Sequence, residues 1–276
     1  MAHELTRICS NITSLKDIQG DILRHRKLQP LQITVLNLHS NKIARLDGEV
    51  LGGLSSLATL DLSSNWIEKI EGLGKLHQLT YLNLSNNKVR ILIFMCPGPF
   101  RNANKAHRKI RQIAGLDGLH SLRTLYLSFN EIKTLDGMVS MHGNIHSLRF
   151  LDLKGNNIDD VRELSYLAGC TRLQDLILHG PSSARINPLC NQDSALYRVS
   201  VFRLLPNIRT LDSTNEDGQA ISPDTSALDI PDLRNYKAAL IAMDMDLSEE
   251  NGYGFAHGQL SLSLTSSQAE HISFLQ

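Results

Sequence analysis

Leucine and isoleucine recur along this chain in an eleven-residue pattern, Leu-x-x-Leu-x-Leu-x-x-Asn-x-Ile, in which x is any residue. Five copies keep the apolar positions and the asparagine in register, and they begin at Ile33, Leu57, Leu79, Leu122 and Leu148. The spacing of the two central leucines predicts a short strand, with these side chains in a core and the intervening ones on the opposite face. Because each copy is too small to bury its own apolar side, we expect successive copies to stack and share one core.

The asparagine of each copy follows the predicted strand, at the point where the chain must turn. Its side-chain amide both donates and accepts hydrogen bonds, and a buried turn leaves backbone groups that need such partners. We therefore predict a structural role, rather than a chemical one, for Asn41, Asn65, Asn87, Asn130 and Asn156.

The five copies resemble the leucine-rich repeat family. Their starting positions lie 24 residues apart from Ile33 to Leu57 and 22 apart from Leu57 to Leu79, as in the short, 22-residue intracellular class of these repeats. The resemblance implies an α/β fold, a leucine-rich repeat solenoid with a curved parallel β-sheet. Its convex side is expected to carry 3₁₀ or short helices.

One repeat is interrupted. Val89 and Ile113 are 24 positions apart, whereas the equivalent residues of the preceding repeat are three apart, so we predict an insert over residues 91–111. Its second half is basic, which allows two interpretations: a loop that docks on an acidic partner, or an irregular surface insertion, perhaps a feature of one isoform. We favour the surface insertion because solenoids tolerate extra residues at loop positions.

The repeat domain, residues 33–186, is expected to be covered at both ends. Residues 1–32 are assigned to an N-terminal cap with a partial repeat, in which residues 12–18 look like a partial strand over the first edge. Residues 187–213 contain Asn-Pro, Tyr-Arg, Leu-Pro and Leu-Asp in that order. This order resembles the C-terminal cap of intracellular leucine-rich repeat proteins, a turn followed by a helix and a last strand.

Beyond the cap, residues 214–276 lose the periodicity and become richer in Ser, Asp and Gly, so we expect a mostly disordered tail. A short helix is the one element predicted there, over residues 231–247, with its proline tolerated in the first turn. The chain contains no sustained heptad pattern.

Composition narrows the classes of partner. The formal net charge is zero, with 28 basic and 28 acidic residues, so neither nucleic acid nor an anionic membrane is expected as the main partner. The four cysteines are scattered and no apolar leader opens the chain, which favours the cytoplasm. No segment has the roughly 18 apolar residues that a membrane-spanning helix needs.

Catalytic and metal-binding motifs are missing from the sequence. The histidines mostly recur at equivalent places in successive repeats, and no cysteine has a neighbour at ligand spacing. Asp61 and Asp152 belong to repeats that are not adjacent, so they are expected to lie too far apart to act as an acid/base pair. We therefore predict no enzymatic activity, no cofactor, no metal and no small-molecule substrate.

The concave face of the sheet is the expected binding surface for a protein partner. Aromatic side chains from consecutive repeats suggest a ridge that would anchor such a partner. The alternative is that these aromatics serve cross-strand packing, and the sequence leaves both interpretations open. The predicted binding residues are Tyr81, Tyr126, Phe150, Asn37, Asp61, Asn83, Asp152, Lys154 and Asp175.

The order of features also resembles the N-terminal repeat domain of the centrosomal leucine-rich repeat and coiled-coil family. The resemblance rests on residues 38–43, 60–65 and 141–153, the last with an added Met-His-Gly, and on the C-terminal cap. It implies a scaffold in centrosome, centriole and spindle-pole organisation or cilium assembly, in the cytoplasm and cytoskeleton. The long coiled coil that should follow the repeats in that family is absent from this chain.

Two alternatives to a centrosomal scaffold stay open. A regulatory subunit that cradles a protein phosphatase 1-type enzyme would be expected to have a more charged concave face than this one. An axonemal or dynein-associated repeat protein is the other alternative.

Overall fold

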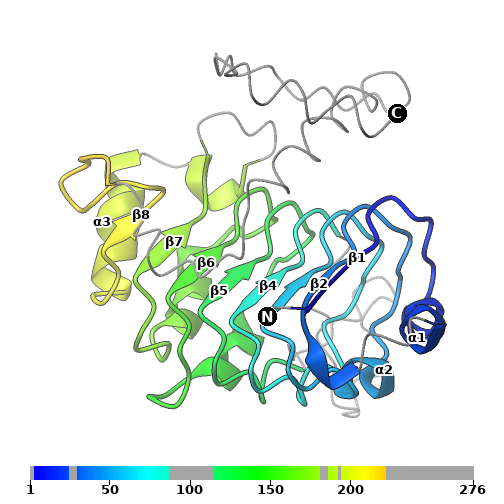
Figure 1. The fold of residues 1–276 in the computed structure, drawn as a ribbon. Coiled ribbons are helices and arrows are strands. Elements are labelled where there is room, and N and C mark those ends of the chain that lie inside the picture. The colour runs from blue at the N-terminus through cyan, green and yellow to red at the C-terminus, as the bar shows by residue number, and fades with distance from the viewer. Residues whose placement is uncertain (1–2, 25–29, 88–114, 181–185, 192–193, 222–276) are drawn as a thin grey trace, which may run out of the picture. The chain divides into compact units, whose positions relative to one another are not determined.

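The computed structural model describes residues 3–24, 30–87, 115–180, 186–191 and 194–221, all within one compact unit that runs from Met1 to Pro231. Eight strands form a single parallel sheet in which the spatial order follows the chain order (Figure 1). The strands are β1 His3–Thr6, β2 Ile33–Asn37, β3 Thr59–Asp61, β4 Tyr81–Asn83, β5 Thr124–Tyr126, β6 Phe150–Asp152, β7 Asp175–Ile177 and β8 Thr210–Leu211. This topology confirms the predicted leucine-rich repeat solenoid. The insert over 91–111 and the helix over 231–247 lie outside the described residues.

The register of the sheet matches the sequence pattern. The second leucine of each of the five copies pairs with its equivalent in the next strand, and the equivalent leucines of β7 and β8 continue the row. All seven are almost completely buried: Leu36, Leu60, Leu82, Leu125, Leu151, Leu176 and Leu211. A shift by one residue would move every apolar side chain of a strand to the other face. The leucine spacing therefore fixes which side chains face the shared core and which lie on the opposite face of the sheet.

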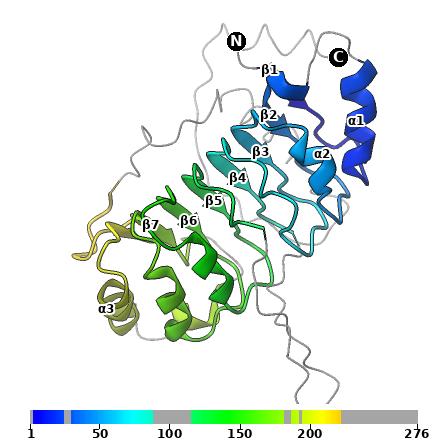
Figure 2. The same cartoon turned by 90° about the horizontal axis from the view of Figure 1, so that it is seen from below.

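Short helical segments return the chain from one strand to the next. They are α2 Gly48–Gly52 and the 3₁₀ helices η1 Pro30–Gln32, η2 Asp136–Met141 and η3 Val161–Leu167, as expected for this class of repeat. In Figure 2, α2 and the helical segments before β6 and β7 lie along the side of the stack away from the strands. Asp47 caps α2 by accepting hydrogen bonds from two backbone N–H groups of its first turn.

The N-terminal repeat differs from the prediction. The strand expected over residues 12–18 is wrong: Leu15–Arg24 form helix α1, and β1 covers the edge of the sheet instead. Leu15 and Ile18 are buried on the inner side of α1, and Ile12 is buried in the segment just before it. The short polar strand β1, with Leu5 as its buried residue, carried too weak a pattern to be predicted.

The C-terminal end has the expected helix and strand. The 3₁₀ helix η4 Pro188–Asn191 leads into helix α3, Ser194–Leu204, and strand β8 then adds to the sheet. Tyr197, Val201 and Leu205 are buried against the last repeat, at the helical spacing that the sequence indicated. The described part of the tail continues past β8 with a turn in which Thr214 pairs with Ala220.

Candidate protein-binding face

The sheet face is here the side of strands β2 to β7 that points away from the shared core. The strand register places its side chains in two columns. The first column contains Val35, Thr59, Tyr81, Thr124, Phe150 and Asp175, and the second contains Asn37, Asp61, Asn83, Tyr126, Asp152 and Ile177. Eight of the nine predicted binding residues lie in these columns, and Lys154 follows two residues after Asp152. The structure therefore brings the predicted residues together on one face.

Three aromatic rings pack in a continuous zigzag across this face, which we call the aromatic ridge: Tyr81, Tyr126 and Phe150. The ring centroids of Tyr81 and Tyr126 are 5.6 Å apart, and those of Tyr126 and Phe150 are 5.1 Å apart. Tilted contacts at these distances are favourable for aromatic pairs. The cross-strand packing that the sequence analysis gave as the alternative role of these aromatic residues is thus present. It holds the three rings together as one unit.

The ridge is less accessible than the sequence suggested. Tyr81 is 9% exposed and Phe150 is 8% exposed, whereas Tyr126 is partly exposed. The difference arises because Tyr126 lies in the second column and is flanked on both sides by rings of the first column. Tyr126 is therefore the member of the ridge that a partner would contact most.

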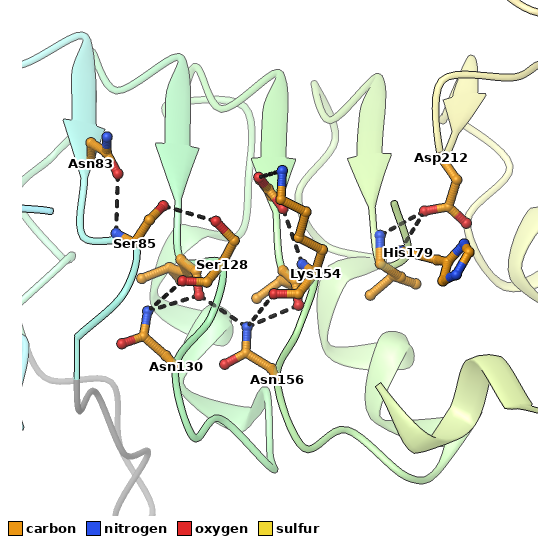
Figure 3. Close-up of polar contacts among 12 residues, drawn as sticks. Asn83, Ser85, Ser128, Asn130, Lys154, Asn156, His179 and Asp212 are labelled. Atoms are coloured by element: carbon orange, nitrogen blue, oxygen red, sulfur yellow. Dashed lines mark hydrogen bonds and ion pairs between the residues drawn. The ribbon is translucent and has the colours of Figure 1, made fainter. Parts of the chain in front are cut away.

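The Asn and Asp side chains of the second column form hydrogen bonds with the backbone at the ends of their own strands. One side-chain oxygen of Asn37, Asp61, Asn83 and Asp152 accepts a hydrogen bond from the backbone N–H two residues further along, at 2.8–3.1 Å. Figure 3 shows this bond between Asn83 and Ser85. Such local bonds are typical of Asn and Asp at turns. The recurrence of Asn or Asp at this position in the sequence is the signal for this bond to the strand end. The role of these residues in binding a partner stays a prediction.

The charges beside the ridge come from Asp152 and Lys154. The Lys154 ammonium lies 3.3 Å from a carboxylate oxygen of Asp152, which is 1% exposed. Burial raises the pKa of the Asp152 carboxyl, and Lys154 opposes this shift by favouring the charged form. Burial, followed by the nearby Asp152 charge, also raises the pKa of Tyr126 to about 12. The Tyr126 hydroxyl is therefore protonated at neutral pH and can donate a hydrogen bond to a partner.

A polar network covers the other part of the face, over β2 to β4. The Asn83 amide donates to Asp61 at 3.2 Å, and the Ser63 hydroxyl also donates to Asp61. A ring nitrogen of His39 lies 2.7 Å from the Ser63 hydroxyl. Each of these residues already has partners within the face, so the network presents a pre-organised polar surface.

The remaining acidic residues of the face do not form a pair. Asp175 accepts a hydrogen bond from the Thr210 hydroxyl at 2.7 Å and so connects β7 to β8. Asp61 and Asp152 are separated by β4 and β5, which is about 14 Å at the usual strand spacing. This distance is too long for a pair of carboxylates that act on one bond.

The asparagines after the strands form a ladder of hydrogen bonds along the stack. The Asn130 amide nitrogen donates to the carbonyl oxygens of Leu127 and Ser128, and also to that of Leu84 in the preceding repeat. Asn156 repeats this arrangement with Leu127, Leu153 and Lys154, as Figure 3 shows. The predicted structural role of these residues is confirmed.

Asn187 also belongs to the ladder, which the sequence did not reveal. It donates to the carbonyl oxygens of Leu153 and Leu178 at 2.9 Å each and accepts from the N–H of Ile158. Residues inserted after β7 displace it from the usual spacing, so the sequence assigned it to the cap.

Among the residues that the structure describes, no three His, Cys, Asp or Glu side chains are grouped closely enough to hold a metal ion. In the same part of the chain, no helix combines the length and the apolar character needed to cross a bilayer.

Comparison with known proteins agrees with the fold. Models of the leucine-rich repeat match residues 32–89 and 144–161. The chain is 31% identical over 172 residues to an uncharacterised leucine-rich repeat-containing protein of Schizosaccharomyces pombe, over 62% of this chain and 23% of that protein. It is 34% identical over 86 residues to human leucine-rich repeat and coiled-coil domain-containing protein 1, over 31% of this chain and 8% of that protein.

A third relative is leucine-rich repeat-containing protein 23 of Bos taurus, which is 31% identical over 172 residues, 61% of this chain and 48% of that protein. The chain thus matches less than half the length of each of these three relatives. The repeat matches, the eight-stranded parallel sheet and the asparagine ladder identify the chain as a leucine-rich repeat protein, a class whose members generally act as protein-interaction scaffolds.

Proposed function

We propose that this chain is a non-enzymatic scaffold that binds a protein partner across the sheet face, with Tyr126 at the centre of the contact. The observation that carries this proposal is the aromatic ridge, in which the Tyr126 ring is held 5.6 Å from that of Tyr81 and 5.1 Å from that of Phe150. A tyrosine whose ring is already fixed in place loses little conformational freedom when a partner covers it. Tyrosine is also among the residues that most often dominate the energy of protein interfaces.

The surroundings of Tyr126 suit a mixed apolar and polar contact. Its hydroxyl is protonated at neutral pH, and the Lys154 ammonium beside the ridge is partly exposed. A partner segment that covers the Tyr126 ring with an apolar side chain would thus meet a hydrogen-bond donor and a positive charge at its edges. This combination supports a protein partner over a small molecule or a membrane surface.

The proposed place of action is the centrosome or centriole, in spindle-pole organisation or cilium assembly. The order of repeats, the lengthened repeat with Met-His-Gly and the C-terminal cap support this proposal through their resemblance to the centrosomal family. The similarity to human leucine-rich repeat and coiled-coil domain-containing protein 1 is consistent with it.

The test expresses tagged chains in dividing cells and compares the wild type with Tyr126→Ala, Tyr126→Phe and one control variant. Each is imaged beside a centriole marker, and its neighbours are identified by proximity labelling. Tyr166→Ala is the matched control, because Tyr166 is an exposed tyrosine of η3, on the side away from the strands. Thermal unfolding of the purified chains establishes that each variant is folded.

The proposal predicts centriolar signal and a defined set of neighbours for wild type and the control. Both should be lost in the alanine variant and weakened in the phenylalanine variant, which keeps the ring but not the hydroxyl. Diffuse signal from the wild type would overturn the centrosomal part of the proposal. Neighbours that are unchanged in a folded Tyr126→Ala chain would overturn the role of the ridge.

A further inference from the structure

A third column of side chains lies beside the two columns of the sheet face. Each of its members comes one residue before a member of the first column, and we call this third column the row. Successive backbone hydrogen bonds, each from an N–H to the carbonyl oxygen of the preceding repeat, join its members at 2.6–2.9 Å. The row is Thr34, Ala58, Thr80, Arg123, Arg149, Gln174 and Arg209. Because each member occupies the same position in its repeat, all seven side chains lie side by side where the strands begin.

Charge is distributed unevenly along this row. Its first three members are uncharged, whereas Arg123, Arg149 and Arg209 are exposed cations. Neighbouring strands lie about 4.8 Å apart, so Arg149 is one strand from Arg123 and about 10 Å from Arg209. No acidic residue belongs to the row, and we call Arg123, Arg149 and Arg209 the arginine row.

Two of these guanidinium groups are available to a partner. Within the described part of the chain, the side chains of Arg149 and Arg209 form no hydrogen bond and no ion pair. Asp175, the carboxylate of the neighbouring column, accepts a hydrogen bond from Thr210 and pairs with neither arginine. Within the described residues, neither Arg149 nor Arg209 is therefore paired with an acidic side chain.

We infer that the arginine row selects an acidic protein segment as the partner, and sets the direction in which that segment lies on the sheet. The inference rests on the proposed function, because the same segment would contact Tyr126. Its acidic residues lie over β5 to β8, where guanidinium forks pair with carboxylates, and its uncharged part lies over β2 to β4. The chain as a whole carries no net charge, so the selection arises from this local row and not from general attraction.

The test measures binding of the full-length chain to two short fluorescent peptides by polarisation. One is rich in glutamate around a central phenylalanine, and the other has lysine in place of every glutamate. The double variant Arg149→Glu/Arg209→Glu is compared with Arg45→Glu/Lys69→Glu, which makes the same change in net charge at exposed residues outside the row. Tyr126→Ala is measured with both peptides.

We expect the wild type to prefer the glutamate peptide, and the arginine double variant to weaken its binding about tenfold. The control double variant should change it less than about twofold, and added salt should reduce the preference because the contacts are exposed. Equal affinity for the two peptides, no binding of the glutamate peptide, or equal loss in both double variants would overturn the inference. Binding of both peptides that depends on Tyr126 but not on the arginines would overturn it while the proposed function stands.

Discussion

The side-chain nitrogen of Asn130 donates a hydrogen bond to the carbonyl oxygen of Leu84 at 3.0 Å, although the two residues are 46 positions apart. Strands β4 and β5 pair in the same register as every other neighbouring pair of repeats from β2 to β7. Asn130 also accepts a hydrogen bond from the N–H of Asn87. The ladder is therefore continuous between these two repeats, whatever the length of chain that connects them.

The first prediction is that removal of residues 91–111 leaves the repeat domain folded. The deletion joins Arg90 to Gln112 and restores the usual spacing between equivalent residues. A shorter connection lowers the entropic cost of closing the loop, so the melting temperature should be unchanged or up to about 4 °C higher. Circular dichroism during heating of the purified chains measures this. A deleted chain that does not fold would show that the segment is part of the core.

The second prediction concerns the ladder itself. Asn130 is completely buried, and Asn130→Ala would leave the carbonyl oxygens and the N–H group that it bonds without their partner. We expect the free energy of unfolding to fall by about 3 kcal/mol. Chemical denaturation measures the change, and Asn207→Ala, at an exposed asparagine before β8, is the control. Equal effects of the two substitutions would contradict the structural role of the ladder.

The third prediction concerns the last strand. Asp212 accepts hydrogen bonds from the N–H groups of Leu178 and His179 at 2.7 and 2.8 Å (Figure 3). It also accepts one from the Tyr197 hydroxyl at 3.0 Å. Its φ of +54° is a conformation in which asparagine is tolerated better than alanine. Asp212→Ala should cost about 2–4 kcal/mol in the free energy of unfolding. Asp212→Asn should cost less, and an equal loss in both variants would contradict this account.

The fourth prediction is a loss of stability on acidification. Burial of His146, followed by the charge of His120, lowers the pKa of the His146 imidazole; His142 acts in the same direction and Asp117 opposes it. The ring of His120 lies 4.9 Å from that of His146. Because the folded state disfavours the proton, stability is present above the unfolded pKa of about 6.5 and falls as the pH drops below it.

His146→Phe keeps an aromatic ring against His120 and removes the titrating group. We expect this variant to lose less stability than the wild type between neutral pH and pH values below about 6.5. His77→Phe is the control, because His77 is an exposed histidine. Melting temperatures measured across this range give the comparison, and an identical pH dependence for His146→Phe and the wild type would contradict the prediction.

The repeats could be predicted from the sequence because their energetics are local to each copy. Leucines such as Leu60 and Leu82, and asparagines such as Asn65, have equivalent neighbours in each repeat, so one pattern describes all the repeats. The N-terminal repeat could not be predicted in the same way, because β1 has few apolar residues and the inner side of α1 has a spacing that can also suggest a strand. Asn187 was assigned to the cap because extra residues before it hide its position in the ladder.

The sequence predicted which face of the sheet carries the candidate site, but not the role or the exposure of each residue on it. Alternation placed Tyr81, Tyr126 and Phe150 on the sheet face, and the structure confirms this placement. Their exposure could not be predicted, since it depends on how the rings shield one another across strands. The arginine row was also missed, because its members precede the alternating positions that the sequence analysis considered.

The bonds between second-column side chains and their own strand ends constrain how this face can change in evolution. Replacement of Asn37, Asp61, Asn83 or Asp152 by an apolar residue removes an acceptor from a backbone N–H, so a gain in affinity there comes with a loss of stability. Tyr126 and Ile177 occupy the same column without such an acceptor. New binding specificity is therefore expected to arise first at β5 and β7, where variation is least costly to the fold.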